Sequence, residues 1–241
     1  MRDILNIPFN ERESIVLASD NSGAIGLKDS DAVKVPYETV AYYSFRVAVM
    51  ECMAAGADPF AVTLNNFCGD NAWDALLAGI KRGLTELKME QINITGSTES
   101  NFNLTQSAVG ITVLGKLDSK AAALNKRIYT PDTNIAVIGT PLVGNEVVDQ
   151  EIDIASLSMF KQICSLDQVV TLPVGSKGIL QELNRLFSNR TFEITQLETS
   201  LNLEKSAGPS TCFIVIYPPE HAKDLKYISG RHLHEVKERL D

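Results

Sequence analysis

The sequence predicts an α+β protein with two domains, and two features support this prediction. Short apolar runs, bounded by glycine, proline or polar residues, alternate with longer segments that repeat apolar residues at helical spacing. The 241 residues are also enough for two domains of ordinary size. We place the boundary after residue 147, so that residues 1–147 form an α/β domain and residues 148–241 form a smaller α+β domain.

A strand is predicted at residues 14–19, followed by a polar loop at residues 20–28. Asp20 and Asn21 supply oxygen atoms to this loop, and Lys28 supplies a cation. Gly23 allows the backbone to turn tightly or to approach a ligand. The loop is therefore a candidate phosphate or metal site. An ordinary glycine-containing turn is the alternative, because the sequence lacks the spacing of a P-loop or of a dinucleotide-binding motif.

A long helix is predicted from Tyr37 to Ala54. Gly56 can end this helix by adopting a left-handed conformation, and Pro59 prevents its continuation. Glu51 is a carboxylate on a helix whose other residues favour burial. It is either a magnesium ligand or a buried glutamate that is satisfied by a hydrogen bond.

A short buried strand is predicted at residues 60–64, and polar side chains follow it. Asn65, Asn66 and Asp70 stand where the strand must end, so they could hold a cation and its phosphate ligands. Ordinary turn asparagines are the alternative. A helix at residues 71–87 comes next, and Trp73 lies on its apolar face, where packing in the core is the favoured role.

A further strand at residues 91–95 is predicted to lead into a loop at residues 96–101. Gly96, Ser97 and Thr98 offer backbone amides and hydroxyl groups to a phosphate, and Glu99 could join the metal ligands. A polar turn with local side-chain capping is the alternative.

The other elements are predicted from the same patterns. A final segment after Pro219 is expected to form a surface helix that carries His232 and His234. Further strands are predicted at residues 33–35, 104–114, 134–138, 169–172, 191–194 and 211–217, and further helices at residues 157–164 and 179–187.

The composition argues against several classes of function. A net charge of −8 argues against general binding to nucleic acid or to anionic membranes. No apolar run approaches the roughly 20 residues needed to span a bilayer, and the N-terminal segment does not read as a signal peptide. The expected location is therefore the cytoplasm. The four cysteines have no CxxC spacing, which makes a zinc site improbable.

Three segments that occur in a fixed order carry a resemblance to a known family. They are SDNSGAIG after the first strand, RVAVMECMAAGADP at the end of the long helix, and ITGSTESNF before a long strand. Together they resemble the aminoimidazole-ribonucleotide (AIR) synthase superfamily, which includes thiamine-monophosphate kinase, selenophosphate synthetase and a hydrogenase maturation factor. The resemblance covers residues 15–144, and within the superfamily the chain looks most like the alpha-ribazole kinase branch.

The resemblance implies ATP bound with magnesium, which a cluster of carboxylates holds. Asp20 and Glu51 match acidic metal ligands, and Asn21 stands where related kinases often have a second aspartate. Ser97 replaces the usual aspartate of a Gly-Gly-Asp-Thr loop, with Glu99 as a possible substitute. Because this chain has fewer carboxylates at these positions, we expect it to hold fewer magnesium ions than members of the superfamily do. The predicted phosphate-binding residues are Asn21, Gly23, Lys28, Asn65, Asn66, Gly96, Ser97 and Thr98.

The resemblance also implies an AIR synthase-like fold, in which first-domain strands form a barrel across a homodimer and the C-terminal domain is shortened. The implied activity is transfer of the ATP γ-phosphoryl group to the 5′-hydroxyl of alpha-ribazole, the lower-ligand nucleoside of cobalamin. Asp20, Glu51 and Asp70 are the predicted catalytic residues, and Asp70 or Asp31 is the candidate base. The alternatives are another acceptor such as thiamine monophosphate, an ATP-dependent ring closure, or a nucleotide-binding regulator without catalytic activity.

Overall fold

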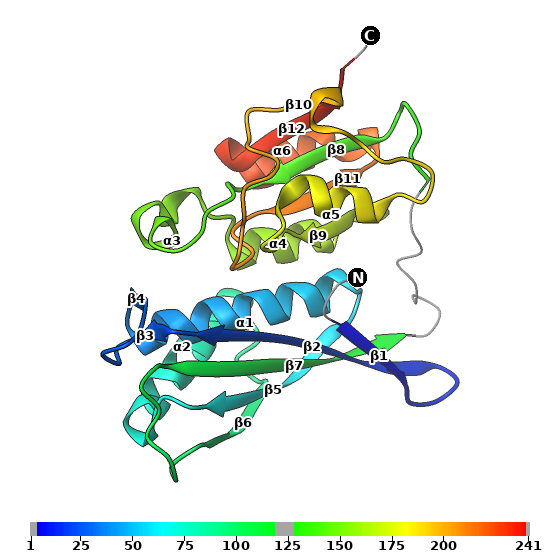
Figure 1. Cartoon of the computed structure of the whole chain (residues 1–241). Coiled ribbons are helices and arrows are strands. Elements are labelled where there is room, and N and C mark those ends of the chain that lie inside the picture. Colours follow the sequence, from blue (N-terminus) through cyan, green and yellow to red (C-terminus); the bar gives the residue numbers. More distant parts are fainter. Residues whose placement is uncertain (1–3, 119–127, 240–241) are drawn as a thin grey trace. The chain divides into compact units, whose positions relative to one another are not determined.

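The structure is a computed structural model, and it describes residues 4–118 and 128–239. The chain forms two compact units, residues 1–123 and residues 124–241. Each unit contains a five-stranded sheet with helices packed against it (Figure 1). The division comes earlier in the chain than the boundary expected after residue 147.

The difference in the boundary comes from one strand, β8 (Asn134–Ile138). Its neighbours in the sheet are β11 (Phe213–Tyr217) and β12 (Leu233–Glu238), and both pairings are antiparallel. β8 therefore belongs to the second unit. The order of elements along the chain hides this, because both partners come from the C-terminal part of the sequence.

The sheet of the first unit has the strand order β1 (Ile4–Pro8), β2 (Glu13–Gly23), β7 (Ala108–Asp118), β5 (Asp58–Asn66) and β6 (Asn93–Thr98). Neighbouring strands are antiparallel except β5 and β6, which run parallel. A crossover through α2 (Trp73–Glu86) connects these two strands. The carboxyl ends of β5 and β6 therefore meet at the same edge of the sheet. A short parallel pair, β3 (Ile25–Gly26) and β4 (Val33–Lys34), precedes the first helix.

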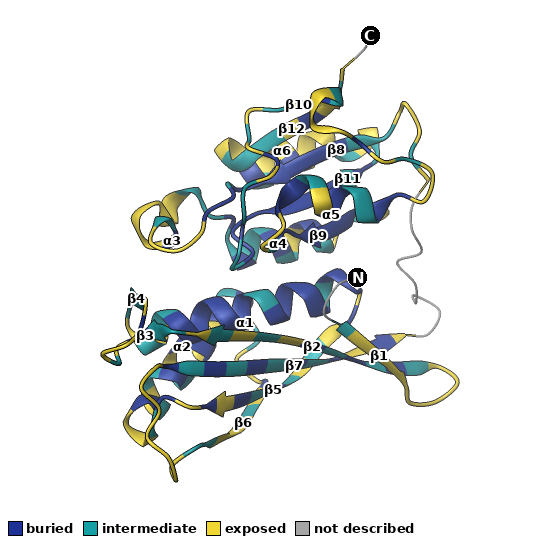
Figure 2. Ribbon diagram, viewed as in Figure 1, coloured by how far each residue is buried: buried dark blue, intermediate teal, exposed yellow. Residues whose placement is uncertain are grey.

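Helix α1 (Tyr37–Ala54) packs against β2, β7, β5 and α2, and its bounds confirm the predicted helix. It ends as the sequence indicates, because Gly56 has a φ of 79° and its amide donates to the Met53 carbonyl at 2.8 Å. Along β2, Val16 and Ala18 are fully buried, whereas Ile15 and Leu17 are half-buried and Ser19 is exposed. The ribbon of β2 accordingly alternates between more buried and more exposed positions (Figure 2). One face of the sheet thus packs against α1, and we call the opposite face the outer face.

The second unit is antiparallel throughout, with the strand order β10 (Leu197–Glu198), β12, β8, β11 and β9 (Val170–Pro173). Helix α5 (Gly178–Leu186) packs with Ile214 in the apolar cluster on one face of the sheet. On the other face, Phe213 meets Phe160 of α4 (Leu157–Cys164) edge to face at 4.8 Å. Helix α6 (Ala222–Ser229) contacts α4, and the short α3 (Glu146–Asp149) follows β8.

Two predictions for the second half of the sequence are wrong. Residues 233–238 form β12, not a surface helix, because Val236 points into the core while its neighbours stay more exposed. Residues 191–194 do not form a strand. Within residues 4–118 and 128–239, no helix is long and apolar enough to cross a membrane.

Candidate functional site

The polar loop predicted after the first strand begins later than expected. β2 continues to Gly23, so Asp20 and Asn21 are strand residues whose side chains point to opposite faces of the sheet. Asp20 shares the face of Ala18, which packs beneath α1, whereas Asn21 is exposed on the outer face. The structure therefore does not bring these two side chains to one ligand.

Three predicted phosphate contacts form a row on the outer face. Asn21 is paired with Gly110, Gly110 with Asn65, and Asn65 with Ser97 across four adjacent strands. The three polar side chains of the row are all exposed. Ser97 lies in β6 and not in a loop, because β6 extends to Thr98.

Asn66 shapes the turn that follows β5. Its side chain accepts from the Cys68 amide at 2.8 Å and donates to the Gly69 carbonyl at 2.9 Å. It also donates to the Thr98 hydroxyl at 3.0 Å, which ties the ends of β5 and β6 together. Asn66 and Thr98 thus position backbone segments at the strand ends.

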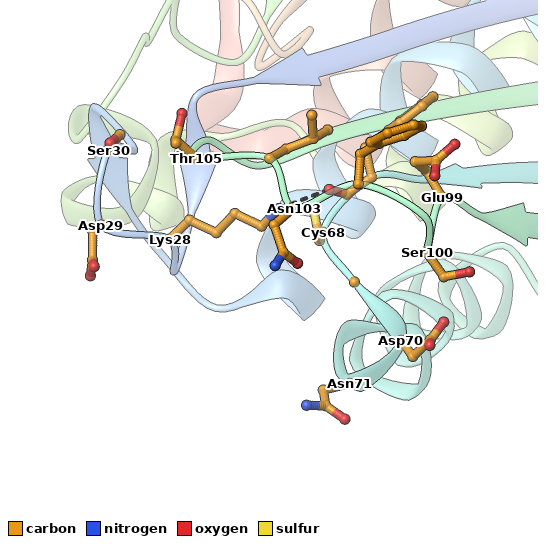
Figure 3. Close-up of a pocket in the computed structure, with 14 residues that line it drawn as sticks. Lys28, Asp29, Ser30, Cys68, Asp70, Asn71, Glu99, Ser100, Asn103 and Thr105 are labelled. Atoms are coloured by element: carbon orange, nitrogen blue, oxygen red, sulfur yellow. Dashed lines mark hydrogen bonds between the residues drawn. The ribbon is translucent and has the colours of Figure 1, made fainter.

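A cavity of about 660 Å³ opens just beyond the ends of β5 and β6. Its walls come from the loop after β3, the turn after β5, and the segment between β6 and β7. Three predicted site residues meet here, because Lys28, Asp70 and Glu99 each belong to a different wall (Figure 3). The lining consists of residues 28–30, 67–71, 99–100 and 102–105.

Two charged residues of the cavity, Lys28 and Glu99, are held by defined backbone contacts. The Lys28 ammonium donates to the Phe67 carbonyl at 2.9 Å, which leaves further N–H donors for a ligand. The Glu99 amide donates to the Asn66 carbonyl at 2.8 Å, and the Glu99 carboxylate accepts from the Asn101 amide at 2.7 Å. Asp70 is exposed at the start of a 3-10 turn, Asp70–Ala72. An ammonium group and free carboxylate oxygens can thus face one small molecule.

Asp31, the other candidate base, is a structural group. Its carboxylate accepts from the Ser107 amide and the Ser107 hydroxyl, both at 2.7 Å, and from the Lys28 amide at 2.9 Å. Burial alone raises the pKa of Asp31, but the hydrogen bonds from Ser107 and Lys28 outweigh burial and hold this pKa below its ordinary value. The carboxylate therefore anchors the loop that carries Lys28 to the start of β7.

We expect Asp31→Asn to lower the free energy of unfolding by about 2 kcal/mol at neutral pH, because an amide group then faces backbone donors. A lowered pKa in the folded state stabilises the fold above the unfolded pKa of about 3.9, and this contribution is lost as the pH falls through the folded pKa. Urea unfolding should therefore show the gap between wild type and variant closing below about pH 4. Asp29→Asn is the control, since Asp29 is exposed and its replacement should change stability by less than about 0.5 kcal/mol. An equal stability of Asp31→Asn and wild type at pH 7 would contradict the anchoring role.

Several lining residues were missed by the sequence reading. Phe67, Phe102 and Leu104 all line the cavity, and all three side chains are exposed. The available signal was the presence of large apolar residues within polar segments that have no strand or helix periodicity. Such residues have no core to fill, so they are candidates for contact with a ligand.

The comparisons with known proteins bear on the fold. No protein-family model and no curated protein sequence matches the chain. Among solved structures, PurL of T. maritima complexed with ADP superposes with a TM-score of 0.59 at 14% identity, covering 97% of this chain and 42% of the PurL chain. The protein tt0281 from Thermus thermophilus gives a TM-score of 0.63 at 12% identity, covering 98% of this chain and 86% of that one. The hydrogenase maturation protein HypE in complex with ATP gives 0.59 at 13% identity, covering 92% and 76%.

The chain has an AIR synthase-like fold. It spans less than half the length of the PurL chains that it matches, but most of the HypE and tt0281 chains. The AIR synthase-like fold predicted from the three sequence segments is thus confirmed, including its shortened second unit.

The resemblance to the AIR synthase superfamily implies magnesium, and the positions of the predicted ligands test whether they could hold one ion. Cys52, which follows Glu51, packs close to Gly115, whereas Cys68 of the cavity contacts Ala108 of the same strand. Residues 108 and 115 of β7 are about 23 Å apart along the strand, so Glu51 lies far from Glu99 and the cavity. Within the part of the chain that the structure describes, no group of three or more His, Cys, Asp or Glu side chains could hold a metal ion. The trio of Asp20, Glu51 and Glu99 is therefore not assembled.

Proposed function

We propose that the protein is an ATP-dependent kinase that transfers the γ-phosphoryl group of ATP to the 5′-hydroxyl of alpha-ribazole. The observation that carries this proposal is the cavity beyond β5 and β6, where one ammonium group and several carboxylates face a space large enough for a nucleoside. The structures of PurL with ADP and of HypE with ATP support an adenine nucleotide as co-substrate. The resemblance to the alpha-ribazole kinase branch supports the acceptor.

The proposed reaction requires few groups of the protein. The 5′-oxygen of the acceptor forms a bond to the γ-phosphorus, the bond from this phosphorus to the bridging oxygen breaks, and ADP leaves. The carboxylate of Asp70 takes the proton of the hydroxyl group, and the ammonium group of Lys28 attracts the phosphoryl oxygens. Magnesium enters with ATP as part of the co-substrate, and no step is assigned to an ion held by the protein.

We further propose that two copies associate through the outer face of the first unit. Leu17 pairs with Leu114 on this face, and both side chains are only half-buried in the single chain. Leu5 is 57% exposed beside Leu17, which extends the apolar part of the face. Pairing of two such faces would close a barrel. Sedimentation equilibrium should then give twice the chain mass of 26.3 kDa. A monomer at micromolar concentration would contradict the proposed association of two copies.

The test of the kinase proposal is ADP production from magnesium ATP, with and without alpha-ribazole. We expect ADP and phosphorylated nucleoside to appear in equal amounts, and only when the acceptor is present. Thiamine monophosphate in place of alpha-ribazole serves as the control acceptor. If thiamine monophosphate supports turnover and alpha-ribazole does not, the proposed acceptor is wrong but the assignment as a kinase stands.

A second candidate is a nucleotide-binding regulator without catalytic activity. It is favoured by the dispersed positions of Asp20, Glu51 and Glu99, and by the exposed position of Ser97 on the outer face, where the family usually has a loop aspartate. ATP binding without ADP production, for every acceptor offered, would favour this candidate.

A further inference from the structure

Part of the cavity lining is apolar, although most of it is polar. Phe102 is 76% exposed, Leu104 is 41% exposed and Phe67 is 40% exposed, and all three line the same cavity. Single exposed apolar residues are common on protein surfaces, but three that share one cavity mark a binding surface. We call these three residues the apolar rim.

The rim is carried by two segments with defined positions. Phe67 directly follows β5, and its carbonyl oxygen accepts from the Lys28 ammonium at 2.9 Å. Phe102 and Leu104 belong to the segment between β6 and β7, whose start is fixed by the hydrogen bonds of Glu99. The rim therefore lies at the ends of the same strands as the charged groups, within reach of one ligand.

The charges of the cavity favour a neutral ligand over an anion. Lys28 contributes one positive charge, whereas Asp29, Asp70 and Glu99 contribute three negative charges. Asp29 lies on the opposite side of the cavity from Asp70 and Glu99, so negative charge is present on both sides (Figure 3). A phosphate group that arrives without a cation is repelled by this distribution. A neutral ring that carries hydroxyl groups is not repelled by these charges.

We propose that the apolar rim binds the uncharged aromatic base of the acceptor nucleoside and selects for a base with few polar groups. The proposal rests on the proposed function, because it places the acceptor in this cavity. Phenylalanine rings stack on a flat base, whereas they cannot satisfy the hydrogen-bonding groups of a purine or pyrimidine. The nearby hydroxyl and carboxylate groups of Ser100 and Asp70 are available for the ribose hydroxyls. The phosphorylated product gains negative charge and should leave this cavity more easily than the substrate binds.

The experiment is isothermal titration of alpha-ribazole and of its free base, without ATP and without magnesium, into wild type and Phe102→Ala. We expect the Kd of both ligands to rise by the same factor, about 5- to 150-fold, because loss of a stacking ring affects the base alone. Phe9→Ala is the matched control, since Phe9 is 69% exposed outside the cavity, and its Kd values should equal those of wild type. In turnover, Phe102→Ala should raise the KM for the acceptor and leave the KM for magnesium ATP unchanged.

The outcomes separate this inference from the proposed function. If the Kd values are unchanged in Phe102→Ala and alpha-ribazole is still phosphorylated, the apolar rim does not bind the base, but the kinase proposal stands. If binding weakens in Phe102→Ala but the wild-type protein forms no ADP, the apolar rim binds the base and the kinase proposal is wrong. The proposed role of the apolar rim would also be wrong if Phe102→Ala raised the Kd of the nucleoside more than that of the free base, or if neither ligand bound to the wild type.

Discussion

Asp70→Asn is expected to lower kcat for acceptor-dependent ADP production by about 100- to 10,000-fold, the usual contribution of a general base. The amide cannot take the proton of the attacking hydroxyl group, whereas the shape of the side chain is kept. The exposed position of Asp70 in the cavity wall predicts little change in stability. The KM for magnesium ATP should stay the same or fall, because the substitution removes one negative charge from the cavity.

Asp74→Asn provides the matched control for this prediction. Asp74 is exposed in the first turn of α2, only four residues after Asp70, but it does not line the cavity. Its kcat should equal that of wild type. A kcat within about threefold of wild type for Asp70→Asn would show that positioning alone drives the transfer, which is common in phosphoryl transfer.

Gly96→Ala is expected to destabilise the first unit by about 3 kcal/mol or more, the upper range for overpacking. A Cβ atom at this position would lie 2.0 Å from the carbonyl oxygen of Leu64, which is backbone and cannot rotate away. β6 pairs with β5 at this point, so the two strands would have to separate. Urea unfolding followed by circular dichroism measures the loss.

The matched control is Gly23→Ala, because a Cβ atom there meets no atom within 4 Å. The sequence predicts phosphate contact for both glycines, so the pair distinguishes a packing role from a ligand role. A Gly96→Ala protein that is as stable as wild type but no longer binds ATP would support phosphate contact and contradict the packing role.

The elements that the sequence predicts well are those whose pattern is local. α1 follows from the spacing of its apolar residues and from Gly56 and Pro59, and it was found at the predicted bounds. The strand ends were predicted too short, because polar residues such as Asn21 and Ser97 look like loop residues. They continue the strands because backbone pairing with distant neighbours determines the end, and an exposed outer face accepts polar side chains.

The candidate site was predicted in part for the same reason. Lys28, Asp70 and Glu99 follow strand ends, and the parallel pairing of β5 with β6 brings the last two to one cavity. Glu51 was grouped with these residues because its carboxylate suits magnesium, but it lies near the C-terminal end of α1, close to the start of β5, whereas Asp70 and Glu99 follow the far ends of β5 and β6. Phe102 was missed because an isolated aromatic residue in a loop has no periodic pattern.

The pairing of β2 with β7 also constrains how the protein can be made. Glu13 pairs with Asp118 and Gly23 with Ala108, so the central ladder of the first unit joins residues that are separated by most of that unit. During synthesis, β1 and β2 leave the ribosome long before β7 does. Until β7 has emerged, one edge of β2 has no native partner. Contacts of such long range slow folding and leave the nascent hairpin open to association with other chains. Efficient production of this protein should therefore depend on how quickly translation reaches residue 118.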